Sequence, residues 1–127
     1  IERLMNKIRS KSDDLVKYEE FMLDDAEVCI IAYGSISRGA KEAVMKLRND
    51  GIKAGLFRPI TLWPSPIAKL QEIGKRFEKI MVTELNKGQY LEEIQRVMKR
   101  DDFATLHKAN GRPIAPLEMV AKVKEMM

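Results

Sequence analysis

The sequence predicts an α/β protein whose strands form a parallel sheet. Short apolar runs, bounded by charged residues or glycine, alternate along the chain with segments whose apolar residues recur at helical spacing. This order of strand, helix, strand and helix is typical of parallel sheets, because each crossover must return the chain to the same end of the sheet. The 127 residues are 45% hydrophobic and 33% charged, as expected for one globular domain.

The first 25 residues differ from the rest in charge and in pattern. They carry five basic and seven acidic side chains, whereas the remaining residues carry 18 basic and 12 acidic ones. Residues 10–14 interrupt a helical stripe of four apolar side chains, Ile1, Leu4, Met5 and Ile8. We therefore expect residues 1–25 to form an N-terminal helix and an acidic connector, and residues 26–127 to form the α/β domain.

The first predicted strand spans residues 28–33, a continuous apolar run that is typical of a buried parallel strand. Cys29 lies inside this run, so we expect its thiol to be buried and its pKa to be raised. An amphipathic helix follows from Ile36, with its apolar stripe continuing to Leu47. Asn49, Asp50 and Gly51 then end the helix.

Three more strands are predicted, over residues 52–57, 79–84 and, more weakly, 103–107. Between the first two of these, three prolines in residues 58–66 indicate an ordered loop. A short helix over about residues 67–77 follows this loop, weakened by Gly74. Two further helical stripes comprise Leu91, Ile94, Val97 and Met98, and then Leu117, Val120, Ala121 and Lys124, with Pro116 in the first turn of the last helix.

Composition excludes several classes of function. The single cysteine cannot form an internal disulfide or supply the four thiolates of an iron–sulfur cluster, and the single histidine, His107, has no second histidine to complete a metal site. The chain has no run long enough to span a membrane and no secretory signal, so we expect a cytoplasmic protein without a membrane partner. Its basic residues are scattered and few aromatic residues accompany them, so we expect no nucleic-acid partner.

The turn over residues 34–41 supports an alternative function, a free-standing nucleotide-binding module. It contains Gly34 and Gly39 between a strand and a helix, where a phosphate-binding loop would lie, and a helix N-terminus can hold an anion. A phosphate-binding loop, however, needs lysine directly after its second glycine and then serine or threonine. The sequence places Ala40 and Lys41 there, and Ile36 replaces the second glycine of a dinucleotide-binding pattern. We therefore favour a plain strand-to-helix turn and keep nucleotide binding as the alternative.

Residues that follow the predicted strands gather at one edge, because the carboxyl ends of parallel strands lie together. No nucleophile is paired with a base among these residues, and we expect Arg58 and Glu84 to form an ion pair or to reach a partner. Tryptophan is common at interface hot spots, so Trp63 is a further contact candidate, although it could simply cover the edge of the core. The candidate docking edge comprises Gly34, Ser35, Arg58, Pro59, Trp63, Glu84, Asn86, Gly88 and Gln89.

Three motifs in order give the chain a recognisable resemblance to one family. They are Ala-Tyr-Gly-Ser at residues 32–35, Leu-Phe-Arg-Pro-Ile-Thr-Leu-Trp-Pro at 56–64 and Val-Thr-Glu-Leu-Asn-Lys-Gly-Gln at 82–89. With Asn-Gly-Arg-Pro-Ile at 110–114, they resemble the alpha subunit of 2-oxoacid:ferredoxin oxidoreductases over about residues 26–124. The resemblance implies a transketolase C-terminal-like domain, with a three-layer α/β/α fold and a small, mostly parallel sheet. We expect it to lie at the C-terminal end of a longer alpha subunit, which fits a chain that starts at Ile1 rather than methionine.

The resemblance also implies the chemistry of the whole enzyme. Enzymes of this family oxidatively decarboxylate a 2-oxoacid to an acyl-CoA, using thiamine diphosphate with Mg²⁺, and pass electrons through iron–sulfur clusters to ferredoxin. This chain has neither a Gly-Asp-Gly stretch for the diphosphate nor enough cysteines for a cluster. We therefore expect a non-catalytic assembly domain with no cofactor of its own, which packs with the remaining alpha-subunit domain and the beta subunit. Ferredoxin and CoA are expected as partners of the whole enzyme, and the identity of the 2-oxoacid cannot be read from this domain.

Overall fold

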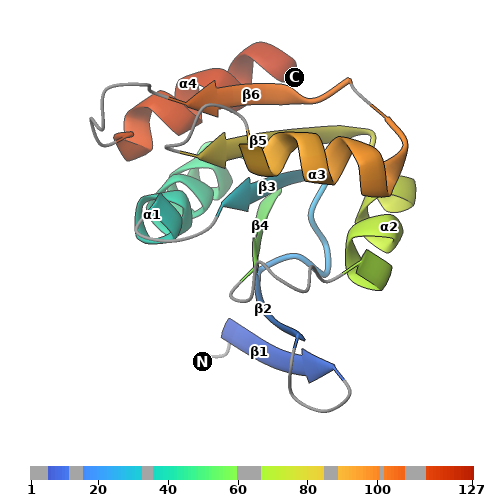
Figure 1. The fold of residues 1–127 in the computed structure, drawn as a ribbon. Coiled ribbons are helices and arrows are strands. Elements are labelled where there is room, and N and C mark those ends of the chain that lie inside the picture. Colours follow the sequence, from blue (N-terminus) through green and yellow to red (C-terminus); the bar gives the residue numbers. More distant parts are fainter. Residues whose placement is uncertain are drawn as a thin grey trace.

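The computed structural model describes residues 6–11, 16–32, 36–59, 67–84, 89–100, 102–107 and 114–127. In this part of the chain an N-terminal hairpin precedes four strands that alternate with four helices (Figure 1). The elements are β1 (Asn6–Lys11), β2 (Val16–Phe21), β3 (Val28–Ala32), α1 (Ile36–Asn49), β4 (Ala54–Pro59), α2 (Ile67–Arg76), β5 (Lys79–Glu84), α3 (Gln89–Met98), β6 (Ala104–His107) and α4 (Pro116–Met126).

The strands form one sheet in the order β1-β2-β4-β3-β5-β6. The last four strands of this order are mutually parallel, whereas β2 runs antiparallel to β4 and β1 runs antiparallel to β2. The chain passes from β3 to β4 on one side and then crosses to β5 on the other side of β3. The predicted mostly parallel sheet is confirmed, and the direction of the crossovers reverses between β3 and β5.

Two helices cover each face of the sheet. The core against α1 and α4 contains Val28, Ile30 and Ala32 of β3, whereas the core against α2 and α3 contains Cys29 and Ile31. Successive residues of a strand point to opposite faces, so the fully buried apolar run of β3 supplies both cores at once. This arrangement confirms the three-layer α/β/α fold. Figure 1 shows the hairpin at one end of the sheet and β6 with α4 at the other.

The N-terminal segment differs from the predicted helix, and this prediction is wrong for the residues that the structure describes. Residues 6–11 and 16–21 are strands that pair with each other, and β2 also pairs with β4, so the hairpin extends the same sheet. Residues 1–5 lie outside the described residues. A helix of about eight residues has little stability of its own. Pairing with β2 gives the backbone of β1 interstrand hydrogen bonds instead, and β2 is itself paired with the edge of β4. This strand pairing overrides the helical spacing.

The second predicted strand lies two residues later than expected. Gly51, with a φ of 89°, ends α1, and the amide of Ile52 donates to the carbonyl of Leu47. Ile52 and Lys53 therefore complete the exit from the helix, and β4 begins at Ala54. The other predicted helices and strands of the α/β part agree with the structure to within one or two residues at the ends that were predicted.

Arg100 ties the end of α2 to the end of α3. Its guanidinium group donates to the carbonyl oxygens of Gly74 and Phe77 at 2.7 Å and of Glu78 at 3.0 Å, and pairs with Asp102 at 2.7 Å. The last carbonyls of a helix have no partner within the helix, so Arg100 satisfies groups that would otherwise stay unpaired.

Gly74, which was expected to weaken α2, allows the two helices to approach. A Cβ atom at this position would lie 2.9 Å from Cγ of Met98 in α3. The glycine thus has a packing role that compensates for its low helix propensity.

Replacing Arg100 by glutamine is expected to lower the free energy of unfolding by about 2 kcal/mol, because several carbonyls lose a charged donor at a largely buried position. Urea denaturation at pH 7 measures the change. The exposed neighbour Lys99 provides a matched control, and Lys99→Gln is expected to change stability by less than about 0.5 kcal/mol. Equal stability of the two variants would show that Arg100 does not hold the helix ends together.

Candidate functional site

The carboxyl ends of the parallel strands lie at one edge of the sheet, as the docking hypothesis requires. Arg58 and Pro59 end β4, Glu84 ends β5, and Gln89 begins α3. The register places Phe57 opposite Ile31, and Thr83 opposite Ala32, so β3 lies between the strands of Arg58 and Glu84. The backbones of Arg58 and Glu84 are therefore roughly 10 Å apart, which is two strand spacings.

Most of the other predicted docking residues lie outside the described part of the chain. For Glu84 and Gln89 the structure describes the backbone but not the side chain. The docking role of this edge stays a prediction. The residues that lie outside entirely are Gly34, Ser35, Trp63, Asn86 and Gly88.

Arg58 has an internal partner, Glu19 of β2. Nη1 of Arg58 lies 2.9 Å from Oε1 of Glu19, and Nζ of Lys41 in α1 lies 2.8 Å from Oε2 of the same carboxylate. The Glu19 side chain is only 2% exposed, whereas those of Lys41 and Arg58 are 27% and 33% exposed. Burial alone would raise the pKa of Glu19, but the hydrogen bonds and charges of the two cations outweigh it and lower the pKa. Glu19 is therefore ionised at neutral pH, and it holds two cations.

Glu20, the next residue of β2, is bound on the opposite face of the sheet. Nζ of Lys69 in α2 lies 2.6 Å from Oε2 of Glu20 and 3.2 Å from the exposed carboxylate of Glu72. Burial alone would lower the pKa of Lys69. The hydrogen bonds and charges of the two carboxylates raise it by more, so the net shift is upward. Glu19 and Glu20, hereafter the acidic pair, thus attach β2 to both helical layers.

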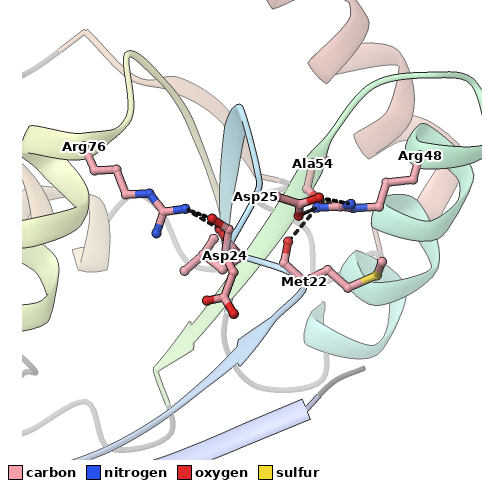
Figure 2. A network of polar contacts seen from close by, with 7 residues as sticks. Met22, Asp24, Asp25, Arg48, Ala54 and Arg76 are labelled. Atoms are coloured by element: carbon pink, nitrogen blue, oxygen red, sulfur yellow. Dashed lines mark hydrogen bonds and ion pairs between the residues drawn. The ribbon is translucent and has the colours of Figure 1, made fainter. Parts of the chain in front are cut away.

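Two arginines bind the connector between β2 and β3, and Figure 2 shows them reaching it from opposite sides. Arg48 of α1 forms an ion pair with Asp25 at 2.7 Å. The hydrogen bond from Arg48 is the main reason why the pKa of Asp25 is lowered. Arg76 comes from the end of α2 on the other face. At distances of 2.6–2.8 Å, the two guanidinium groups donate to the carbonyl oxygens of Met22, Leu23, Asp24 and Ala54.

Neither the acidic pair nor the lysines that bind it were predicted from the sequence. Two signals were available. Val16, Tyr18 and Phe21 are strand-forming residues in a segment that was assigned to the connector. The negative first 25 residues also precede a positive remainder, and opposite charges of this kind can pair across a sheet.

The residues that the structure describes do not form a binding site for a metal ion. Among the described residues, no three side chains of histidine, cysteine, aspartate or glutamate come together as a ligand set. Cys29 is buried as predicted, and burial raises the pKa of its thiol, which disfavours the thiolate that binds metals. The described residues therefore offer no ligand set for an iron–sulfur cluster or a metal ion.

Lys41 is also the lysine on which the nucleotide-binding alternative depends. It lies inside α1 with its ammonium group on buried Glu19 and 5.7 Å from the ring centre of Phe21. This charge is already engaged by an internal carboxylate, so the structure gives no support to a phosphate site that uses it.

Within the described residues, no helix has the length and apolar character needed to cross a membrane.

The fold is transketolase C-terminal-like, as predicted. It resembles a solved structure titled split gene transketolase, inactive beta4 tetramer, with a TM-score of 0.69 and 19% identity over 84% of this chain and 40% of that chain. The chain belongs to the family described as pyruvate:ferredoxin oxidoreductase core domain II, whose model matches residues 26–119.

Two similar proteins come from this group of enzymes. The ketoisovalerate oxidoreductase subunit VorB of Methanothermobacter marburgensis is 36% identical over 97% of this chain and 35% of its own length. A structure of the 2-oxoglutarate:ferredoxin oxidoreductase from Magnetococcus marinus, with 2-oxoglutarate, coenzyme A and succinyl-CoA bound, has a TM-score of 0.77 and 30% identity over 85% of this chain and 19% of that one. The chain thus spans about a third of the length of this curated relative.

Proposed function

We propose that this domain has a non-catalytic, structural role in a 2-oxoacid:ferredoxin oxidoreductase subunit. The observation that carries the proposal is the use of its charged side chains. At the described part of the carboxyl edge, Lys41 and Arg58 both bind the buried carboxylate of Glu19, an arrangement that fastens a strand and prepares no group for catalysis. Family membership supplies the context, since the domain is one part of a larger oxidoreductase.

The intact protein, on this proposal, oxidises a 2-oxoacid to an acyl-CoA and passes the electrons to ferredoxin. Thiamine diphosphate, Mg²⁺ and the iron–sulfur clusters would then be held by the remaining alpha-subunit domain, the beta subunit or other chains, and the enzyme would work in the cytoplasm. The relatives are named for different 2-oxoacids, ketoisovalerate in one case and 2-oxoglutarate in another. The proposal therefore extends to the class of substrate and leaves the individual acid open.

The proposed contact with the neighbouring domain or subunit is the candidate docking edge. The crossovers reverse direction between β3 and β5, and open α/β sheets present their functional surfaces at the carboxyl ends of strands beside such a reversal. Gly34 and Ser35 follow β3, and Asn86 and Gly88 follow β5, so the sequence positions flank this point. Arg58, one third exposed, ends the strand on the other side of β3.

Assembly of the intact enzyme tests this contact. Trp63→Ala and Glu84→Lys are expected to weaken association with the beta subunit at least about tenfold, because the loss of an interface tryptophan commonly has an effect of this size. Analytical ultracentrifugation of the purified subunits measures the association. Lys75→Glu, a charge reversal at the exposed end of α2 and at the opposite edge of the sheet, is the control and is expected to have no effect. Unchanged association in both carboxyl-edge variants would refute the docking edge.

The non-catalytic role has a separate test. The 127-residue chain alone is expected to give no viologen reduction with a 2-oxoacid, CoA, thiamine diphosphate and Mg²⁺, whereas the intact enzyme is active under the same conditions. Reduction that depends on the 2-oxoacid and is catalysed by the isolated chain would overturn the proposal.

A further inference from the structure

Besides its backbone pairing, strand β2 is attached to the rest of the domain by ion pairs to α1, β4 and α2. Among its described side chains, those of residues 18–21, the most buried are the acidic pair, Glu19 and Glu20, which are 2% and 6% exposed. Its aromatic side chains, Tyr18 and Phe21, are only partly buried and pack at the margins of the two cores. Buried ion pairs contribute little net stability compared with apolar groups of similar size, yet losing one partner is costly. The attachment of β2 therefore depends on the acidic pair keeping its partners.

The partners of the acidic pair remain partly in contact with solvent. Lys41, Arg58 and Lys69 are 27%, 33% and 17% exposed and belong to α1, β4 and α2. When β2 leaves the sheet, both carboxylates and all three cations can become fully hydrated, so no buried charge is left uncompensated. By contrast, β3 contributes five fully buried residues to both cores and cannot leave without opening them.

A residue with an unfavourable backbone conformation lies directly after β2. Met22 adopts a φ of 54°, a left-handed conformation that costs energy for a residue other than glycine. Its carbonyl is held by Arg48, and the next two carbonyls are held by Arg76. A strained residue thus lies at the junction between β2 and a connector that is fixed to both helical layers.

From these observations we infer that β2 detaches from β4 as a unit, together with β1, while the rest of the α/β/α fold stays intact, and that the acidic pair controls this opening. The released state exposes the backbone edge of β4 and frees Arg58 and Lys41. The opening is a local unfolding event of the kind that hydrogen exchange detects below the global unfolding free energy. It does not depend on the docking role of the carboxyl edge.

Native-state hydrogen exchange with mass spectrometry tests the inference in the purified protein. In the wild type, the amides of residues 18–21 are expected to exchange at least about tenfold faster than those of β3, with a weaker dependence on urea. In the Glu19→Gln/Glu20→Gln variant, exchange in β2 is expected to accelerate by a further factor of about ten or more, with no change in β3. Glu125→Gln, which neutralises an exposed ion pair with Lys122, is the control and leaves both strands unchanged.

Two outcomes would overturn the inference. If β2 and β3 of the wild type exchange at the same rate and with the same urea dependence, β2 opens only when the whole domain unfolds. If the double variant leaves exchange in β2 unchanged, the acidic pair does not control the opening. The wild-type measurement decides the first question even if the double variant fails to fold.

Discussion

Replacing Arg58 by glutamate is expected to lower the free energy of unfolding by about 3 kcal/mol or more. The new carboxylate would lie beside Glu19, which is almost fully buried and would keep only Lys41 as a partner. Two carboxylates in this position repel each other, and Glu19 cannot move into solvent without pulling β2 away from β4. Because Arg58 itself is one third exposed, the loss of its own contact is the smaller part of the effect.

Urea denaturation at pH 7 measures this loss. Lys122→Glu provides the control, because it creates the same repulsion in an exposed pair with Glu125 and is expected to cost less than about 0.5 kcal/mol. A neutral double variant, Glu19→Gln/Arg58→Gln, is expected to recover most of the lost stability, since it leaves no unpaired buried charge at this position. An Arg58→Glu variant within about 1 kcal/mol of the wild type would contradict the assigned role of Glu19.

Replacing Gly55 by alanine is expected to lower the free energy of unfolding by about 2–3 kcal/mol. A Cβ atom at this position in β4 would lie 2.8 Å from the carbonyl oxygen of Met22 and from Cβ of Ala26, and 2.9 Å from Cα of Leu23. Two of these contacts are with backbone atoms. The guanidinium groups of Arg48 and Arg76 hold this backbone in place, so it cannot yield cheaply.

Gly39→Ala is the matched comparison, with an expected change of opposite sign. Gly39 lies in α1, and a Cβ there would have its nearest contact at 3.6 Å, an ordinary van der Waals distance. Alanine has the higher helix propensity, so this variant is expected to gain about 0.5–1 kcal/mol. Equal effects of the two glycine substitutions in urea denaturation would show that the close approach at Gly55 is not decisive.

The elements of the α/β part could be predicted because their signals are local. The apolar run of β3 and the stripe of α1 each show their environment within a few residues of sequence, and the order of elements then indicates a parallel sheet. The hairpin could not be predicted in this way. The spacing of Ile8 with earlier apolar residues fits a helix. Its strand partner is Glu19 of β2, and β2 in turn pairs with β4, more than thirty residues later.

The candidate site shows the same division. Arg58 could be placed at the carboxyl edge, since it directly follows a predicted strand. Its partner could not be predicted, because Glu19 precedes Arg58 by 39 residues and lies in the segment that was assigned to the connector. Lys41, which binds the same carboxylate, precedes Arg58 by 17 residues and belongs to another element, α1. The role of Gly74 was hidden for a similar reason, because Met98 comes from the following helix. Long-range pairing, and not local propensity, decides each of these cases.

The arginines at the helix ends have a consequence for sequence variation in this domain. Arg48, Arg76 and Arg100 bind mainly to carbonyl oxygens of the main chain, which every amino acid carries. Side chains at exposed positions such as Asp24 and Glu78 can therefore be exchanged during evolution while these ties persist. We expect selection to preserve the three donors more strictly than the residues whose carbonyls they contact, so that the turns can diverge between relatives around constant anchor points.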